Sequence, residues 1–341
     1  MRASTGTVIA GLFFLSACTG TRDVVREEAG AGTPAPVAVT DAHFRVYTGA
    51  GQPAALGDVV AAMGGADVVF LGEMHDDPVA HFLQAELLQA AFARHSGQRP
   101  VALSLEMFDR DVQHVLDEYL DSLITERHFL SATNPWNNYA TDYRPMVEFA
   151  RVHGLAVLAA NAPRRYVNRV GRLGPASLDA LGEQAKAVLP PLPYPGPTAA
   201  YQAKWNRLMQ ASMAPHGEGG EQHPAPADSA AHPSAHPSPH AAPEISNMLH
   251  AQALWDAGMA HTIAGYLDAH PSALVLHVVG GFHVSGGTGT PEALAHYRPG
   301  VRILNIALRP AADLASFPAE LSGEGDFVVL TDAGLPRTFR Q

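Results

Sequence analysis

The 341-residue sequence is poor in cysteine, in lysine and in charge. A single cysteine, Cys18, excludes an intramolecular disulfide, and the two lysines, Lys186 and Lys204, are interpreted as a composition bias. Charged residues make up 16% of the chain, with a formal net charge of −11. Because a nucleic-acid binder needs a basic face to displace counterions, this balance argues against a nucleic-acid partner. The 47% of hydrophobic residues instead favours a globular chain with a sizeable core.

The lone cysteine follows a short apolar run near the N-terminus. Residues 8–15 are apolar, and Leu-Ser-Ala-Cys at 15–18 matches a lipobox, in which the cysteine receives lipid and becomes the new N-terminus. The run is too short to span a bilayer. We expect 1–17 to be a signal peptide and Cys18 to be a lipid anchor in the cell envelope, and Thr19 after it favours the outer membrane. An ordinary signal peptide cut at a nearby alanine is the alternative.

Composition divides the rest of the chain. Residues 18–40 are rich in Gly, Ala, Pro and charge and are expected to form a flexible, lipidated tether. Residues 41–341 are expected to form one α/β domain, interrupted by a disordered His/Pro-rich insertion at 215–243. The proline-rich run 190–197 cannot be helical. The insertion histidines either bind metal ions loosely or belong to a low-complexity expansion; they are His216, His223, His232, His236 and His240.

Short apolar runs alternate with helical patterns along the domain. Strands are expected at 67–71, 101–105, 155–160, 273–279, 301–308 and 327–331. Helices are expected at 78–95, 109–124, 144–153, 198–213 and 244–269. Strands separated by connections of helix length predict an α/β fold, with a mostly parallel sheet covered by helices on both faces.

Polar side chains come directly after three of the predicted strands. Glu73 and His75 follow the first strand, Glu106 the second and His283 the fourth. Because ligands bind at the carboxyl ends of the strands in such sheets, we expect these four side chains to share one site. Carboxylates and imidazoles can hold a divalent metal such as Zn²⁺, activate water or transfer a proton. The alternative is a set of ordinary loop residues, and Asp77 is expected to cap the helix that follows.

The glycines at 280 and 281 precede His283 and would allow a ligand to approach the backbone closely. Four segments then resemble the ChaN family of haem-binding lipoproteins: Gly-Glu-Met-His-Asp at 72–76, Ser-Leu-Glu-Met-Phe at 104–108, Ala-Asn-Ala-Pro-Arg-Arg at 160–165 and Val-Val-Gly-Gly-Phe-His at 278–283. The resemblance covers about 67–308, apart from the insertion. It implies a surface protein that binds haem for iron acquisition, with a homodimer around the haem and a receiving receptor or transporter as further expectations.

The family belongs to a superfamily with Tiki proteases and erythromycin-esterase-like proteins. The resemblance to this superfamily implies an alternative function, a metal-assisted hydrolase that uses Glu73, His75, Glu106 and His283. For haem, iron accepts His, Tyr, Met or Cys, and cations suit the propionates. Aromatic residues in 136–145 are expected to pack on the porphyrin or, alternatively, to form a packed loop whose tyrosine hydroxyls bond to backbone. Arg164 and Arg165 are expected at the rim, where one of them alternatively pairs with Glu73 or Glu106. The expected haem contacts are His75, His283, Tyr139, Tyr143, Arg144, Arg164 and Arg165.

Overall fold

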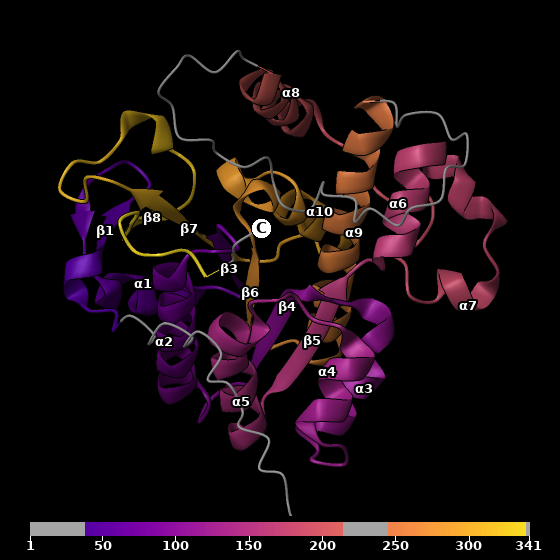
Figure 1. The fold of residues 1–341 in the computed structure, drawn as a ribbon, viewed down its shortest axis with the longest axis horizontal. Coiled ribbons are helices and arrows are strands. Elements are labelled where there is room, and N and C mark those ends of the chain that lie inside the picture. Colours follow the sequence, from indigo (N-terminus) through magenta and orange to yellow (C-terminus); the bar gives the residue numbers. More distant parts are fainter. Residues whose placement is uncertain (1–37, 214–244, 339–341) are drawn as a thin grey trace, which may run out of the picture. The chain divides into compact units, whose positions relative to one another are not determined.

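The computed structural model describes residues 38–213 and 245–338, all within the unit Val37–Gln341. An eight-stranded sheet forms its centre, in the order β2-β1-β8-β7-β3-β6-β4-β5 (Figure 1). The strands are β1 Phe44–Thr48, β2 Pro53–Ala54, β3 Val68–Glu73, β4 Val101–Asp109, β5 Ala156–Asn161, β6 Leu274–Gly280, β7 Ile303–Ala311 and β8 Phe327–Asp332. The strands from β8 to β5 run parallel, which confirms a mostly parallel sheet, and β1 pairs antiparallel with β8 and β2.

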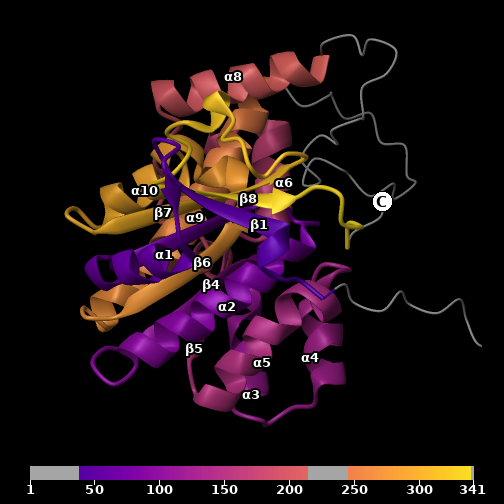
Figure 2. The same cartoon turned by 90° about the vertical axis from the view of Figure 1, so that its left-hand side faces the viewer.

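Helices cover both faces of the sheet, as predicted. They are α1 Leu56–Ala62, α2 Pro78–His95, α3 Gln113–Leu120, α4 Glu126–Thr133, α5 Arg144–His153, α6 Arg164–Leu173, α7 Glu183–Lys186, α8 Ala199–Met213, α9 Ile245–Ala269 and α10 Thr290–Tyr297. Along β3, Val69 and Leu71 face a core shared with α2 and α5, whereas Phe70 faces a core shared with α6, α9 and α10. Figure 2 shows α2 and α5 on the other side of the sheet from α9 and α6. Strands buried on both faces explain the continuous apolar runs in the sequence.

The N-terminus of α2 is fixed by the predicted cap. The carboxylate of Asp77 accepts hydrogen bonds from the main-chain nitrogens of Val79, at 3.0 Å, and Ala80, at 3.2 Å. Its other oxygen accepts one from the hydroxyl of Thr331 in β8. Asp77 therefore joins the first turn of α2 to β8, two residues after His75 in the chain.

Replacing Asp77 with alanine is expected to lower the free energy of unfolding by about 1–2 kcal/mol, because two amide donors lose their acceptor. Urea denaturation followed by circular dichroism measures the change. Asp121→Ala, at an exposed position at the end of α3, is the control and is expected to change stability by less than about 0.5 kcal/mol. Equal stabilities of the two variants would contradict a capping role.

The structure changes some predicted boundaries. β4 continues to Asp109, so the helix predicted at 109–124 is a 3-10 turn, Arg110–Val112, followed by α3. The run 190–197 contains no helix, as predicted. The signal peptide, Cys18, most of the tether and the insertion 215–243 lie outside the described residues. Among the residues that are described, no helix is long and apolar enough to cross a membrane.

Candidate functional site

The four predicted site residues converge where β3, β4 and β6 end. Glu73 and Gly280 are paired neighbours in the sheet register. A Cβ atom added to Gly280 would lie 3.0 Å from Nε2 of His75 and 3.4 Å from Oε2 of Glu106, so both side chains contact this glycine. Oε1 of Glu106 lies 3.6 Å from Nε2 of His283. The parallel sheet thus places His75, Glu106 and His283 in one row, with Glu73 behind His75.

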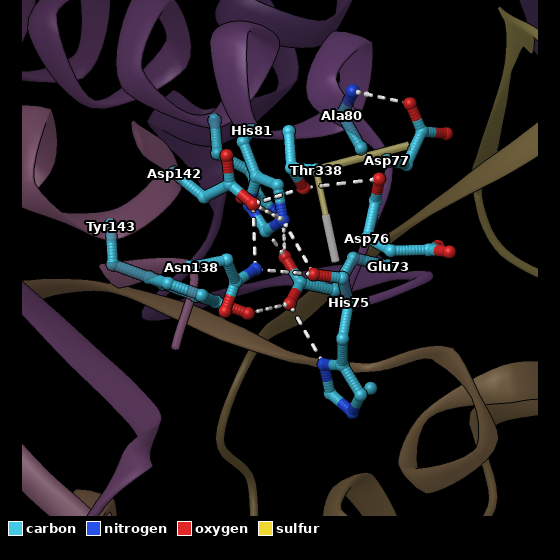
Figure 3. Close-up of polar contacts among 12 residues, drawn as sticks. Glu73, His75, Asp76, Asp77, Ala80, His81, Asn138, Asp142, Tyr143 and Thr338 are labelled. Atoms are coloured by element: carbon cyan, nitrogen blue, oxygen red, sulfur yellow. Dashed lines mark hydrogen bonds and ion pairs between the residues drawn. The ribbon is translucent and has the colours of Figure 1, made fainter. Parts of the chain in front are cut away.

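Glu73 is the centre of a buried polar cluster (Figure 3). Its Oε1 lies 3.0 Å from Nδ1 of His75 and accepts a hydrogen bond from the hydroxyl of Tyr143. Its Oε2 accepts a hydrogen bond of 2.5 Å from Nε2 of Gln84 and lies 3.3 Å from Nδ1 of His81. Both oxygens of this carboxylate are therefore engaged by side chains from α2, the His75 loop and the segment before α5.

The same cluster contains a second carboxylate. Nε2 of His81 lies 3.3 Å from Oδ2 of Asp142, so the His81 ring lies between Asp142 and Glu73. Burial by itself would lower the pKa of His81, but the two carboxylates outweigh it and the pKa lies above 6.5. Burial by itself would raise the pKa of Glu73, but the charge of His81 and the hydrogen bond with His75 bring it below 4.5. The cluster is therefore a charged ion-pair network inside the fold.

His75 links this cluster to the surface. An ionised Glu73 can only accept hydrogen bonds, so Nδ1 of His75 donates one to it and this bond holds the ring. Figure 3 shows the ring directed away from Asn138 and Asp142. The side chain is 21% exposed and packs edge-on against Trp136, with ring centroids 4.4 Å apart. Glu73 thus fixes the orientation of a partly exposed imidazole.

His283 is held by residues that the sequence did not single out. Its Nδ1 lies 2.9 Å from Oδ1 of Asp256 in α9, which also accepts a 2.7 Å hydrogen bond from Thr290 in α10. All three side chains are buried. A lone aspartate within the apolar stretch 253–260 was the available signal, because a buried carboxylate needs a partner.

The two glycines before Phe282 make room for side chains of the protein itself. Gly280 contacts His75, as described above, and a Cβ atom on Gly281 would lie 2.8 Å from Nη2 and 2.9 Å from Cζ of Arg309. His75 fills the space at Gly280, whereas Gly281 also lines the open pocket described below, so close approach of a ligand to the backbone there stays a prediction. Small residues at these two positions allow an imidazole and a guanidinium to pack against the end of β6.

The two tyrosines expected to face a porphyrin lie in the core. Tyr143 is 1% exposed and donates its hydroxyl hydrogen to Glu73, and burial raises its pKa well above 10. Tyr139 is 3% exposed and packs near the rings of Phe108 and Phe129. The alternative prediction of a packed segment fits their burial, although Tyr143 bonds to a carboxylate rather than to backbone.

The predicted arginines lie outside this row of residues or are exposed. Arg144 forms a two-pronged ion pair with Glu126, with N–O distances of 2.6 and 3.0 Å. Arg165 pairs with Asp111 at 2.5 Å and not with a carboxylate of the site. Arg164 is exposed at the start of α6. The structure therefore pairs Arg165 with Asp111 and not with Glu73 or Glu106.

The predicted metal site is not supported. Within 38–213 and 245–338, no group of three or more His, Cys, Asp or Glu side chains is arranged to hold a metal ion. Part of the physical reason lies in the contacts already described, because Tyr143 and Gln84 occupy the two oxygens of Glu73. The residues form a row of hydrogen-bonded pairs rather than a ring of ligands around one point.

An open pocket of about 800 Å³ lies beside this row. Met74 and Phe282, the neighbours of His75 and His283 in the chain, line one side of it. Its basic lining residues are Lys204 and Arg207 from α8 and Arg309 from β7. None of these three cations was singled out from the sequence, because nothing in it indicates that α8 packs near the end of β6.

A family model described as haem-binding uptake, Tiki superfamily, ChaN matches residues 59–294. A solved structure of ChaN from Campylobacter jejuni, described as binding haem cofacially, aligns with a TM-score of 0.57 and 16% sequence identity. The alignment covers 86% of this chain and 98% of that one, and at this identity it shows a shared fold.

Two other solved structures align less well. An erythromycin esterase in its open conformation has a TM-score of 0.43 and 13% identity, over 85% of this chain and 83% of that one. A Bacillus cereus protein has a TM-score of 0.44 and 10% identity, over 85% and 95%. No curated protein matches the sequence. Because the family model spans well over half of the chain, this protein belongs to the ChaN family of haem-binding uptake proteins in the Tiki superfamily.

Proposed function

We propose that this protein binds haem in the open pocket beside His75. The observation that carries the proposal is the position of this imidazole. Glu73 holds its Nδ1, and the partly exposed ring reaches the surface next to Met74, which lines the pocket. A histidine imidazole is a common axial ligand of haem iron. The family membership supports the same ligand.

The residues around the pocket fit the chemistry of haem. His75 offers a nitrogen for the iron, and Met74, 38% exposed, offers a thioether at the same rim. The Phe282 ring provides an apolar surface for a porphyrin face. Lys204 and Arg207 provide positive charge for its carboxylates. A planar, apolar ligand with two acidic groups meets each of its requirements here.

Hydrolysis has less support than binding. A hydrolase would need Glu106 and His283 to reach a substrate, but these side chains are only 2% and 3% exposed. Nor do the four predicted residues form a metal-binding group. The exposed member of the row, His75, is placed to bind a ligand at the pocket rather than to work with two buried partners.

The haem proposal is tested by titrating the purified mature protein with haemin and following the Soret band. We expect saturable binding by the wild type, and a Kd at least about tenfold higher for His75→Ala, because a coordinate bond to iron is lost. His153→Ala, at an exposed histidine of α5, is the matched control and is expected to bind normally. An unchanged Kd and spectrum for His75→Ala would remove His75 from the site, and no Soret shift in any protein would refute haem binding.

We further propose that the protein is anchored in the outer membrane through lipid on Cys18 and acts in haem-iron acquisition. The lipobox at 15–18 and the uptake role named for the family support this. A homodimer around the haem, and a transporter that receives it, belong to the same proposal. Mass spectrometry of the N-terminal peptide tests the anchor: we expect a diacylglyceryl or triacyl adduct on Cys18 and its loss in Cys18→Ser, with release from membranes. An unmodified N-terminus at another residue would refute it.

A further inference from the structure

The wall of the pocket that α8 contributes contains a fixed ammonium group. Nζ of Lys204 donates hydrogen bonds to the carbonyl oxygens of Phe282, at 2.5 Å, and Ser285, at 3.2 Å. The same nitrogen lies 4.7 Å from the centroid of the Phe282 ring and 4.9 Å from that of Tyr201. These contacts hold the charge at the edge of the pocket, next to its apolar side, instead of leaving it on a freely moving chain.

The charges of the pocket are not all balanced within the protein. Arg309 forms a two-pronged ion pair with Glu324, with N–O distances of 2.7 and 3.1 Å, so its charge is compensated. The partners of Lys204 are neutral carbonyl groups, and the described parts of the chain contain no ion pair of Lys204 or of Arg207. The acidic lining residues of this pocket of about 800 Å³ are Glu324, which pairs with Arg309, and Glu320, which forms no ion pair with either cation of α8 in the described structure. Lys204 and Arg207, one helical turn apart on α8, thus carry charges that no ion pair within the described residues compensates.

The ammonium group is in its charged form at neutral pH. Burial lowers the pKa of Lys204 to about 8, and the charges of nearby carboxylates oppose this effect. A group with this pKa is mostly protonated at pH 7. A partly desolvated cation gains more from an anionic ligand than a fully hydrated one does, because screening by water is weaker.

We infer that Lys204 and Arg207 bind the propionate carboxylates of haem. The basic side chains of α8 then lie at the propionate edge of the ligand, and the loop of Met74 and His75 lies at its iron. The inference rests on the proposed function. The apolar ring of Phe282 lines the same pocket beside the Lys204 ammonium, and this favours a ligand that joins carboxylates to a flat apolar body over a small inorganic anion. Ammonium and guanidinium groups form strong, charge-assisted hydrogen bonds with carboxylates.

The experiment compares haemin with haemin dimethyl ester, in which both propionates are uncharged. The proteins are the wild type, Lys204→Gln and Arg207→Gln, with Lys186→Gln and Arg172→Gln as controls at the other lysine and at an exposed arginine of α6. We expect the wild type to bind haemin at least about tenfold more tightly than the ester. Each α8 variant is expected to weaken haemin binding about three- to tenfold and to leave ester binding unchanged.

Ester binding also reports whether the pocket is intact, because Lys204 holds the turn at Phe282 and Ser285, whereas Arg207 is exposed and makes no such contact in the described structure. Equal affinities of the wild type for haemin and its ester would overturn the inference while leaving haem binding in place. An unchanged haemin affinity in Arg207→Gln, together with equal losses for both ligands in Lys204→Gln, would assign Lys204 a purely structural role and overturn it too. No Soret shift with either ligand would overturn both proposals.

Discussion

Replacing Glu73 with alanine is expected to lower the free energy of unfolding of the haem-free protein by about 3–5 kcal/mol. The carboxylate is buried and serves four partners at once, Tyr143, Gln84, His75 and His81. Its removal leaves buried donors without an acceptor and a protonated His81 with only one of its two carboxylates. Each unsatisfied buried group costs free energy in addition to the cavity that the truncation leaves.

A second variant at Glu73 separates the effect of its charge from that of its size, and a variant at an exposed glutamate is the control. Glu73→Gln keeps the size of the side chain but removes the charge, and we expect an intermediate loss because Nδ1 of His75 then faces a neutral amide. Glu86→Ala, at an exposed position of α2, is expected to change stability by less than about 0.5 kcal/mol. Urea denaturation at pH 6 measures all three variants. A loss below about 1 kcal/mol for Glu73→Ala would show that the cluster does not stabilise the fold.

The same cluster predicts a pH window. The pKa of Glu73 is lowered in the folded state, so its contribution to stability is present above about pH 4.5 and is lost as the pH falls. The pKa of His81 is raised, so its contribution is fully present below about pH 6.5 and is lost as the pH rises through the folded pKa. Both contributions are therefore fully present only between these two values.

The sequence was sufficient for the central strands and for the row of residues at their ends. Continuous apolar runs mark strands buried on both faces, and the carboxyl ends of parallel strands meet at one edge. Glu73, His75, Glu106 and His283 could therefore be expected to converge. The antiparallel pair β1 and β2 was missed because its strands are short and lie at the edge of the sheet, where little of the chain is buried.

The partners of these residues could not be predicted, because they lie on helices whose packing the sequence does not specify. Asp256 orients His283 from the middle of α9, and His81 and Gln84 reach Glu73 from α2. In the sequence, each is one polar residue in a helical pattern. Tyr143 illustrates the same limit: its residue type suits haem iron, but its position in the fold makes it a buried partner of Glu73.

His277 carries the second large prediction, an acid-dependent loss of stability. It lies in the middle of β6, fully buried, with Nδ1 2.9 Å from the hydroxyl of Ser104 in β4 and, within the described residues, no hydrogen-bond partner for Nε2. Burial, reinforced by the nearby charge of His283, lowers the pKa of His277 to about 3. Below pH 6.5 the unfolded chain therefore binds a proton that the folded chain does not, so stability falls as the pH falls.

The expected size of this loss is about 1.4 kcal/mol for each pH unit below 6.5, up to about 5 kcal/mol near pH 3. His277→Asn keeps a polar partner for Ser104 and removes the titrating ring, so it is expected to lose this part of the acid sensitivity.

The free energy of unfolding in urea, measured for both proteins between pH 7.5 and pH 4, gives the difference in acid sensitivity directly. All other titrating groups are shared by the two proteins, so their contributions cancel to a first approximation. His153→Asn removes an exposed histidine but keeps His277, so this control is expected to lose stability at low pH as the wild type does. A difference between wild type and His277→Asn that stays constant with pH would mean that His277 accepts a proton inside the fold, and that β6 is more open to water than its burial indicates.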